Sequence, residues 1–113
     1  MKKIIYAKSL SLFLKKLKES QLPIISVILF GSYARGDYNE DSDIDVLVIV
    51  KKRTSEINKK IIHLACQAEW ETVTNEWIAP LIIDQKHFEL WKSLQLSIYR
   101  NIQAEGKTLW KIN

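Results

Sequence analysis

Residues 24–50 read IISVILFGSYARGDYNEDSDIDVLVIV, and this stretch decides the fold. It begins and ends with apolar segments rich in β-branched residues, 24–30 and 44–50, and each is typical of a buried strand. Gly31 ends the first strand, and a polar loop runs from it to Ser42. Two buried strands joined by a polar loop predict a sheet that helices cover on at least one face.

Helical periodicity flanks this stretch on both sides. Residues 7–20 and residues 55–70 each carry an apolar stripe at helical spacing, and Thr54 or Ser55 can cap the second helix. The two stripes consist of Tyr6, Leu10, Phe13, Leu14 and Leu17, and of Ile57, Ile61, Leu64, Ala65 and Ala68.

The last third of the chain adds one strand and two helices. Residues 77–83 predict a third strand, and Pro80 places it at an edge of the sheet because proline lacks a backbone N–H. Asp84 can cap the next helix, and a last helix over about 95–105 ends at Gly106. The predicted fold class is α/β (α+β), a small mixed sheet of three or more strands with helices packed on it.

Composition indicates an ordinary globular protein. The 113 residues, 47% hydrophobic and 27% charged, predict a single domain over 1–113. No run approaches the roughly 20 apolar residues of a membrane span, and the N-terminus lacks the features of a signal peptide. The single cysteine, Cys66, excludes a disulfide framework, so we expect a cytoplasmic protein. A net charge of +4 with dispersed lysines does not favour direct nucleic-acid binding.

The loop after the first strand has the residues of a phosphate site. Gly31 follows the strand directly, which suits a tight turn and lets a phosphate approach the backbone. Ser32 can donate its hydroxyl and its amide to an anion. If residues 32–35 open a helical turn, further amides point the same way.

Two aspartates begin the next strand. Asp43 and Asp45 are two residues apart, so in an extended chain both carboxylates point to one side. Their like charges repel, and a divalent cation such as Mg²⁺ offsets that repulsion while also binding substrate phosphates. A phosphate loop beside paired aspartates predicts metal-assisted transfer from a nucleoside triphosphate.

Two motifs, GSYARG at 31–36 and SDIDVLV at 42–48, resemble the signature of the minimal nucleotidyltransferases in the DNA polymerase β-like superfamily. The resemblance implies a polymerase β-like palm fold, with ATP as substrate and with Asp43 and Asp45 as catalytic ligands of Mg²⁺. The nucleotide-binding residues that it implies are Gly31, Ser32, Arg35 and Ser42.

The resemblance also implies a partner. Many such proteins are antitoxins paired with a small ribonuclease of the HEPN class, and some add AMP to a tyrosine of that toxin. The first hypothesis is therefore transfer of AMP from Mg-ATP to a hydroxyl, most simply a tyrosine of a partner toxin. The alternative is a non-catalytic module that binds nucleotide or masks the toxin. Modification of a small molecule is a third hypothesis, and a homo-oligomer is also compatible with the sequence.

One position departs from the superfamily pattern. Its third carboxylate, a general base and metal ligand, usually sits on the strand after the central helix, yet 77–83 contains no acid. Glu76 and Asp84 flank that strand, and Glu71 is a third candidate. The residues after Asp84 open a helix, so Asp84 is more readily explained as an N-cap.

Aromatic and aliphatic residues leave two alternatives open. Tyr33, inside the motif, either stacks on a base or is modified, or it rests on the sheet. The C-terminal third either covers a small core as a bent helix pair or presents an apolar patch to a partner or a second copy. Its helical face consists of Phe88, Trp91, Ile98, Tyr99 and Ile102.

Overall fold

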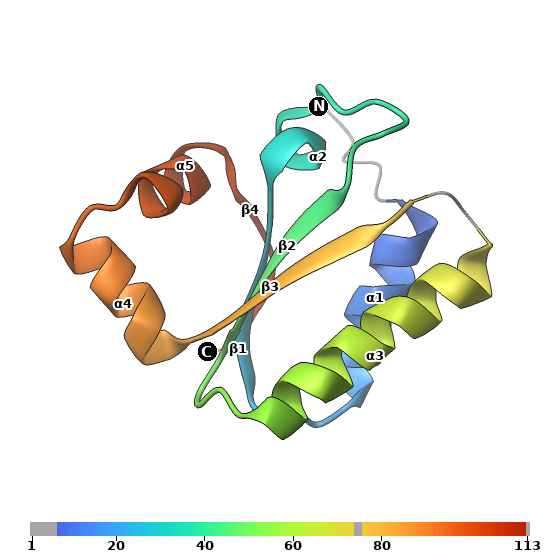
Figure 1. Cartoon of the computed structure of the whole chain (residues 1–113), viewed down its shortest axis with the longest axis horizontal. Helices are drawn as coiled ribbons and strands as arrows, with labels where there is room; N and C mark the ends of the chain where they lie inside the picture. The colour runs from blue at the N-terminus through green and yellow to red at the C-terminus, as the bar shows by residue number, and fades with distance from the viewer. Residues whose placement is uncertain (1–6, 74–75, 113) are drawn as a thin grey trace.

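The structure is a computed structural model, and it describes residues 7–73 and 76–112. Within that part, helices and strands alternate along most of the chain (Figure 1). Their order is α1 (Lys8–Glu19), β1 (Ile24–Phe30), α2 (Gly31–Arg35), β2 (Ile44–Val50), α3 (Ser55–Thr72), β3 (Ile78–Asp84), α4 (Gln85–Ser93), α5 (Ser97–Glu105) and β4 (Lys107–Lys111).

The strands form one mixed sheet in the order β3-β2-β1-β4. β1 runs antiparallel to both β2 and β4, whereas β2 and β3 are parallel. β3 is an edge strand, as Pro80 predicted, because a residue without a backbone N–H fits where one side has no partner.

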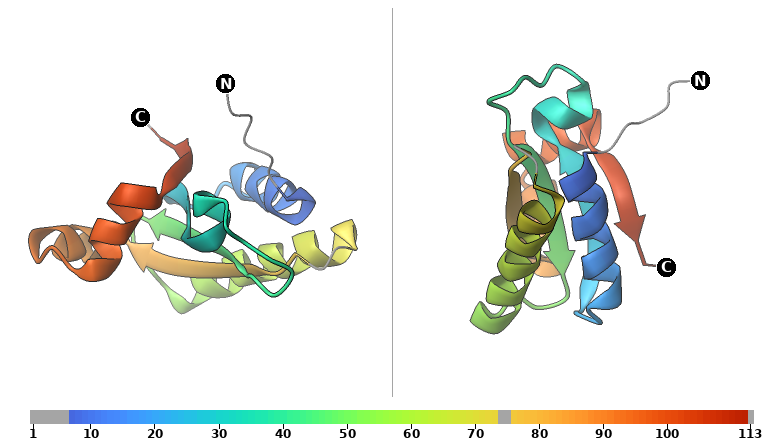
Figure 2. Two further views of the ribbon diagram at one scale, coloured as in Figure 1. Left: turned by 90° about the horizontal axis from the view of Figure 1, so that it is seen from above. Right: turned by 90° about the vertical axis from the view of Figure 1, so that its right-hand side faces the viewer.

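Helices cover both faces of this sheet. α1 and α3 lie together on one side and α4 and α5 on the other, as the views in Figures 1 and 2 agree. Alternation along β2 matches this arrangement: Val46 and Val48 join the core under α1 and α3, while Leu47 joins the core under α4 and α5. Strand β2 is therefore buried from both sides, which explains its nearly continuous apolar sequence.

The core under α1 and α3 confirms the two predicted stripes. Leu10, Phe13 and Leu17 of α1 are buried, and so are Ile61 and Ala65 of α3. Each fully buried leucine or phenylalanine contributes about 1.5–3 kcal/mol by leaving water. Leu14, Ile57 and Leu64 are half-buried against the same core and Ala68 is buried, while Tyr6 lies outside the described residues.

The second core lies under the helix pair α4–α5. Ile102 of α5 is buried there, and Tyr99 of α5 is buried with its ring against Phe88. Phe88, Trp91 and Ile98 are partly buried against this core, so the predicted helix pair over a small core is confirmed. Leucines at 90, 94 and 96 remain exposed on the outside of this pair.

Caps begin two helices where the sequence predicted them. Thr54 Oγ1 accepts a hydrogen bond from the Ile57 N–H at 3.1 Å, and an Asp84 carboxylate oxygen accepts one from the His87 N–H at 2.9 Å. Each bond satisfies an amide that the first helical turn leaves without a backbone partner.

The chain end differs from the prediction. Gly106 does end α5, but its φ of −66° and ψ of 148° are those of extended rather than left-handed backbone. The chain therefore continues straight into β4, a strand that the sequence analysis did not predict. β4 is short and only one face of it is half-buried, so its pattern KTLWK resembles an ordinary polar tail. None of the helices in the described ranges is long and apolar enough to cross a membrane.

Candidate functional site

The motif residues meet at one end of the strands, where β1 ends and the other three strands begin. Because β1 is antiparallel to β2 and β4 while β2 is parallel to β3, the end of β1 lies beside the starts of the other three strands. In this register Phe30 lies opposite Asp45, and Asp45 lies opposite Ala79 of β3. The fold thus places the Gly31 turn directly beside the paired aspartates.

Gly31 and Asp45 are in close contact. Gly31 has a φ of +73°, a left-handed conformation that residues with a side chain rarely adopt. A Cβ at this position would also overlap the Asp45 Oδ2. Glycine is therefore required twice here, for the backbone turn and for the space that the Asp45 carboxylate occupies.

Asp43 and Asp45 are electrostatically coupled, as their spacing predicted. Asp43 is exposed just before β2, and Asp45 is half-buried within it. Partial burial, and then the charge of Asp43, raise the pKa of Asp45, while the charge of Arg35 opposes this rise. The charge of Asp43 is near enough to disfavour the ionised form of Asp45, and this is the repulsion that a cation would relieve.

The donor set suits Mg²⁺. Two carboxylates supply hard oxygen ligands, and Mg²⁺ commonly takes only one or two from the protein and the rest from water and phosphates. Across 7–73 and 76–112, no three His, Cys, Asp or Glu side chains gather to hold a metal by themselves. A cation here therefore fits best together with a bound polyphosphate.

Helix α2 forms the turn beside these carboxylates. Its five residues begin directly after β1, and the side chain of its N-cap residue, Phe30, accepts no hydrogen bond from its first amides. The Ser32 carbonyl accepts hydrogen bonds from the N–H groups of Gly36 and Asp37, at 2.8 and 3.2 Å, which closes the turn. The predicted helical turn is confirmed, with Ser32 half-buried at its start.

Arg35 lies at the rim of the site and is already paired. Its Nε contacts an Asp37 carboxylate oxygen at 3.1 Å, and its Nη1 contacts Glu105 Oε2 at 3.0 Å. The second contact connects α2 to the last residue of α5. The sequence motifs assign no role to Glu105, because the approach of the end of α5 to the motif appears only in the fold.

Ser42 stabilises the loop before the aspartates. Its hydroxyl oxygen accepts a hydrogen bond from the Asn39 N–H at 2.9 Å, and its own N–H donates to the Asn39 carbonyl at 3.1 Å. In this structure the side chain thus holds a turn in the loop, and its predicted contact with nucleotide stays a prediction.

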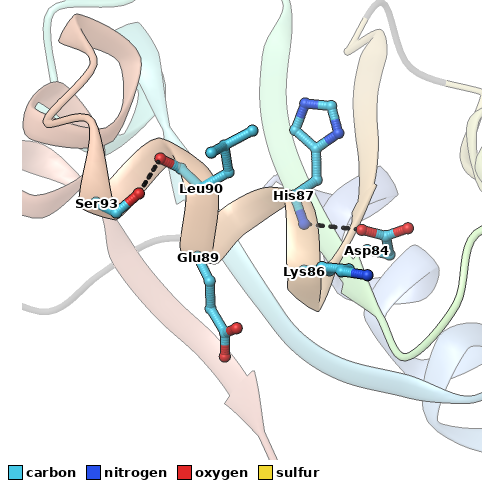
Figure 3. A pocket seen from close by; sticks show the side chains of 6 residues that line it. All are labelled: Asp84, Lys86, His87, Glu89, Leu90 and Ser93. Atoms are coloured by element: carbon cyan, nitrogen blue, oxygen red, sulfur yellow. Dashed lines mark hydrogen bonds between the residues drawn. The ribbon is translucent and has the colours of Figure 1, made fainter.

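The candidates for a third carboxylate are separated by the fold. Asp84 lies opposite Val50, at the other end of β2 and β3, where it caps α4 (Figure 3). The fold therefore does not bring it to Asp45. Glu71 of α3 pairs with Lys16 of α1 at 3.0 Å. Glu76 precedes β3, at the same end of the parallel strands as Asp43.

Ala79 occupies the place where a carboxylate on β3 would meet the pair. It is opposite Asp45 in the parallel register, and alternation puts it on the same face, because Leu47 and Leu81 both contact the core under α4 and α5. The strand thus contributes a methyl group at this point of the site.

A hollow that was not predicted from the sequence lies at the same end of the strands, beside the start of β3. Its volume is about 760 Å³, and Tyr33, Tyr38, Glu76 and Trp77 help to line it. Tyr33 and Tyr38 stack with ring centroids 4.1 Å apart and planes 8° from parallel. Burial and the charge of Glu76 raise the pKa of Tyr33. The signal in the sequence was a pair of tyrosines, Tyr33 and Tyr38, on either side of Gly36, and only the fold brings Trp77 beside them.

The fold thus packs a glycine turn against paired aspartates on a neighbouring strand, which is the arrangement that the sequence motifs predicted for a nucleotidyltransferase. Consistent with this arrangement, the sequence profile of the family described as "Nucleotidyltransferase domain" matches residues 10–108, and the chain belongs to that family.

Curated relatives include two proteins of Methanocaldococcus jannaschii. "Putative protein adenylyltransferase MJ0604" is 32% identical over 90 residues, which are 77% of this chain and 79% of that protein. "Putative protein adenylyltransferase MJ0141" is 62% identical over 40 residues, 34% of this chain. The second match spans 40% of the relative's own length.

Solved structures share the fold. A toxin-antitoxin structure with AMP-PNP contains a chain with a TM-score of 0.59 and 21% identity, and the match covers 91% of this chain and 73% of that one. A structure of a tri-AMPylated Shewanella oneidensis HEPN toxin with its MNT antitoxin gives 0.52 and 19%, covering 92% and 71%.

Proposed function

We propose that this chain transfers AMP from ATP to a hydroxyl of a partner protein, a tyrosine of a HEPN-class toxin, and so acts as a cytoplasmic antitoxin. The observation that carries the proposal is the contact between the Gly31 turn and the Asp45 carboxylate, with Asp43 beside it. The names of the curated relatives support adenylyl transfer, and the toxin-antitoxin structures with this fold support the partner class.

The transfer is a substitution at phosphorus. The acceptor oxygen forms a bond to the α-phosphorus of ATP, the bond from that phosphorus to the oxygen bridging to the β-phosphate breaks, and pyrophosphate leaves. The hydroxyl proton passes to solvent or to a nearby base. Asp43 and Asp45 would hold Mg²⁺, which neutralises charge on the triphosphate when bound. Gly31 and Ser32 supply amides and a hydroxyl that orient the phosphates, and Arg35 adds positive charge at the rim.

Strand β3 does not supply the base. Because Ala79 stands opposite Asp45, activation of the acceptor hydroxyl depends on a group outside β3 or on water. A positioned general base is commonly worth about 10²–10⁴-fold, so we expect slower transfer than in relatives with a third carboxylate. The same observation favours the second candidate function, a module that binds nucleotide and neutralises a toxin by covering it.

Calorimetry with Mg-ATP tests the nucleotide site. The purified chain and its Asp43→Asn/Asp45→Asn variant are titrated with ATP, with and without Mg²⁺. Binding that requires Mg²⁺ and disappears in the variant supports the site. Equal binding by both proteins contradicts it.

Transfer is then tested with ATP labelled at the α-phosphate and the protein encoded by the neighbouring gene. The proposal expects label on that protein with the wild-type chain and a loss of about 10³-fold or more in the double variant. Neutralisation of the toxin that persists in the double variant, without any label, would instead establish the masking function.

A further inference from the structure

The hollow beside the transfer site combines aromatic faces with carboxylates. Tyr33, Tyr38 and Trp77 line it, together with Glu40 and Asp41 from the loop and Glu76 before β3. We infer that this hollow receives a basic side chain, a guanidinium in particular, from the protein that accepts the nucleotidyl group. The inference rests on the proposed function for the identity of the partner, but not for the chemistry of the hollow.

The charge of the hollow is opposite to that of the chain. The chain as a whole carries a net charge of +4, yet among the residues that the structure describes no lysine or arginine lines this hollow. Glu40 and Asp41 form no ion pair with any residue of the described ranges. A triphosphate would be repelled here, whereas a cation would be attracted, so the hollow is not an extension of the phosphate site.

The aromatic side chains distinguish an organic cation from a metal ion. The Tyr33–Tyr38 stack forms a flat, pre-organised wall, and Trp77 is 58% exposed although its indole is large and apolar. A cation over such faces gains about 0.5–1 kcal/mol from the ring quadrupole at exposed sites. A guanidinium can also stack through its plane while it donates hydrogen bonds to carboxylates. A metal ion would use the carboxylates alone, and its site would not need a volume of about 760 Å³.

The hollow is connected to the transfer site through the backbone. The Trp77 carbonyl accepts a hydrogen bond from the Ile44 N–H at 2.8 Å, and Ile44 lies between the two aspartates. The Ser9 hydroxyl donates to the Glu76 carbonyl at 3.1 Å and fixes the same segment against α1. A side chain held in the hollow would therefore have a defined position relative to Asp43. This connection is why we assign the occupant to the acceptor protein.

The test uses a peptide probe and no nucleotide. Acetyl-Arg-Gly-Arg-amide is titrated into the isotope-labelled full chain while NMR follows backbone amides and indole N–H groups, and acetyl-Gln-Gly-Gln-amide serves as the neutral probe. We expect saturable shifts at Trp77, Tyr38 and the residues around Asp41 with the arginine peptide alone. These shifts should weaken as salt is added.

Variants locate the binding. Glu40→Gln/Asp41→Asn removes two exposed charges, and we expect it to weaken the arginine peptide about fivefold or more. Trp77→Ala should act in the same direction. The matched controls are Glu19→Gln/Glu89→Gln, which removes the same charge outside the hollow, and Trp70→Ala, which removes a tryptophan that is 84% exposed. Both controls should bind the peptide like the wild-type chain.

Several results would overturn the inference. These are equal shifts with the glutamine peptide, unchanged affinity in Glu40→Gln/Asp41→Asn, or shifts at these residues with Mg²⁺ but not with arginine. Failure of the proposed function is separate, because it is detected by Mg-ATP titration and by label transfer. In the transfer assay, Glu40→Gln/Asp41→Asn should raise KM for the acceptor protein and leave KM for ATP unchanged. An effect on KM for ATP alone would contradict the assignment.

Discussion

Asp45 lies near the start of β2 and Asp84 lies at the end of the parallel strand β3, so the two aspartates stand at opposite ends of these neighbouring strands. The Asp84 carboxylate accepts the His87 N–H and stabilises the start of α4, so its oxygen is used by the fold itself. Asp45 faces Gly31 and the charge of Asp43, and its pKa is raised because burial and that neighbour both disfavour its ionised form. A carboxylate is thus available for chemistry where the fold leaves its charge poorly compensated.

A substitution at Gly31 should have the largest effect on the difference between Asp45 and Asp84, because it acts on Asp45 alone. We expect Gly31→Ala to lower transfer about 100-fold or more, because the new methyl group displaces the Asp45 carboxylate and small misplacements in a site are costly. Gly36→Ala is the matched control, since Gly36 also has positive φ but a Cβ there meets nothing within 4 Å.

Both glycine variants should lose about 1–2 kcal/mol of stability from the backbone conformation. Only Gly31→Ala should lose activity, as measured by label transfer beside thermal unfolding. Equal activity in the two variants would show that the contact with Asp45 is not required.

Ala79→Asp would sharpen the contrast between Asp45 and Asp84 by adding a further charge next to Asp45. The new carboxylate lies opposite Asp45, and if transfer lacks a base on β3 we expect the rate to rise about tenfold or more. Ala79→Asn, similar in size but uncharged, should not raise it. A rate that falls equally in both variants would show that this position has only a packing role.

Asp84→Ala tests whether Asp84 has only a structural role as the cap of α4. Loss of the N-cap should reduce the free energy of unfolding by about 1 kcal/mol, as Thr54→Ala should at the start of α3. Calorimetry should find the Mg-ATP affinity unchanged in both variants. A marked loss of nucleotide affinity in Asp84→Ala would place this residue in the site after all.

The smallest effect concerns the stability of the site itself. The pKa of Asp45 is raised, so its ionised form destabilises the folded state, and a neutral isostere should relieve this at neutral pH without metal. We expect Asp45→Asn to unfold at a slightly higher temperature, by a few tenths of a kcal/mol in stability. Asp84→Asn should change little, since asparagine also caps helices. A lower unfolding temperature for Asp45→Asn would contradict the electrostatic argument.

The local parts of the fold were predictable because they depend on neighbours in the chain. The strands 24–30 and 44–50 have the predicted bounds, since runs of β-branched residues between glycine, proline and polar turns leave few alternatives. Thr54 and Asp84 were recognisable as caps because a cap acts within three residues.

The remainder depended on contacts between distant segments. β4 has a weak pattern of its own and exists because β1 offers it a free edge. The Arg35–Glu105 ion pair and the hollow at Trp77 require the register of the sheet, which single-segment patterns do not contain. The sequence shows that the strand predicted over 77–83 lacks an acid, but only the pairing of Ala79 with Asp45 shows which position of the strand faces the site.

Pro80 has a consequence for how this protein can meet other chains. It lies in the middle of β3, an edge strand whose outer side would otherwise offer backbone groups to another strand. A proline there interrupts the row of N–H donors, which disfavours extension of the sheet by strand addition and edge-to-edge aggregation. At the outer side of β3, recognition of a partner through side chains is therefore favoured over recognition through backbone pairing with an extended peptide.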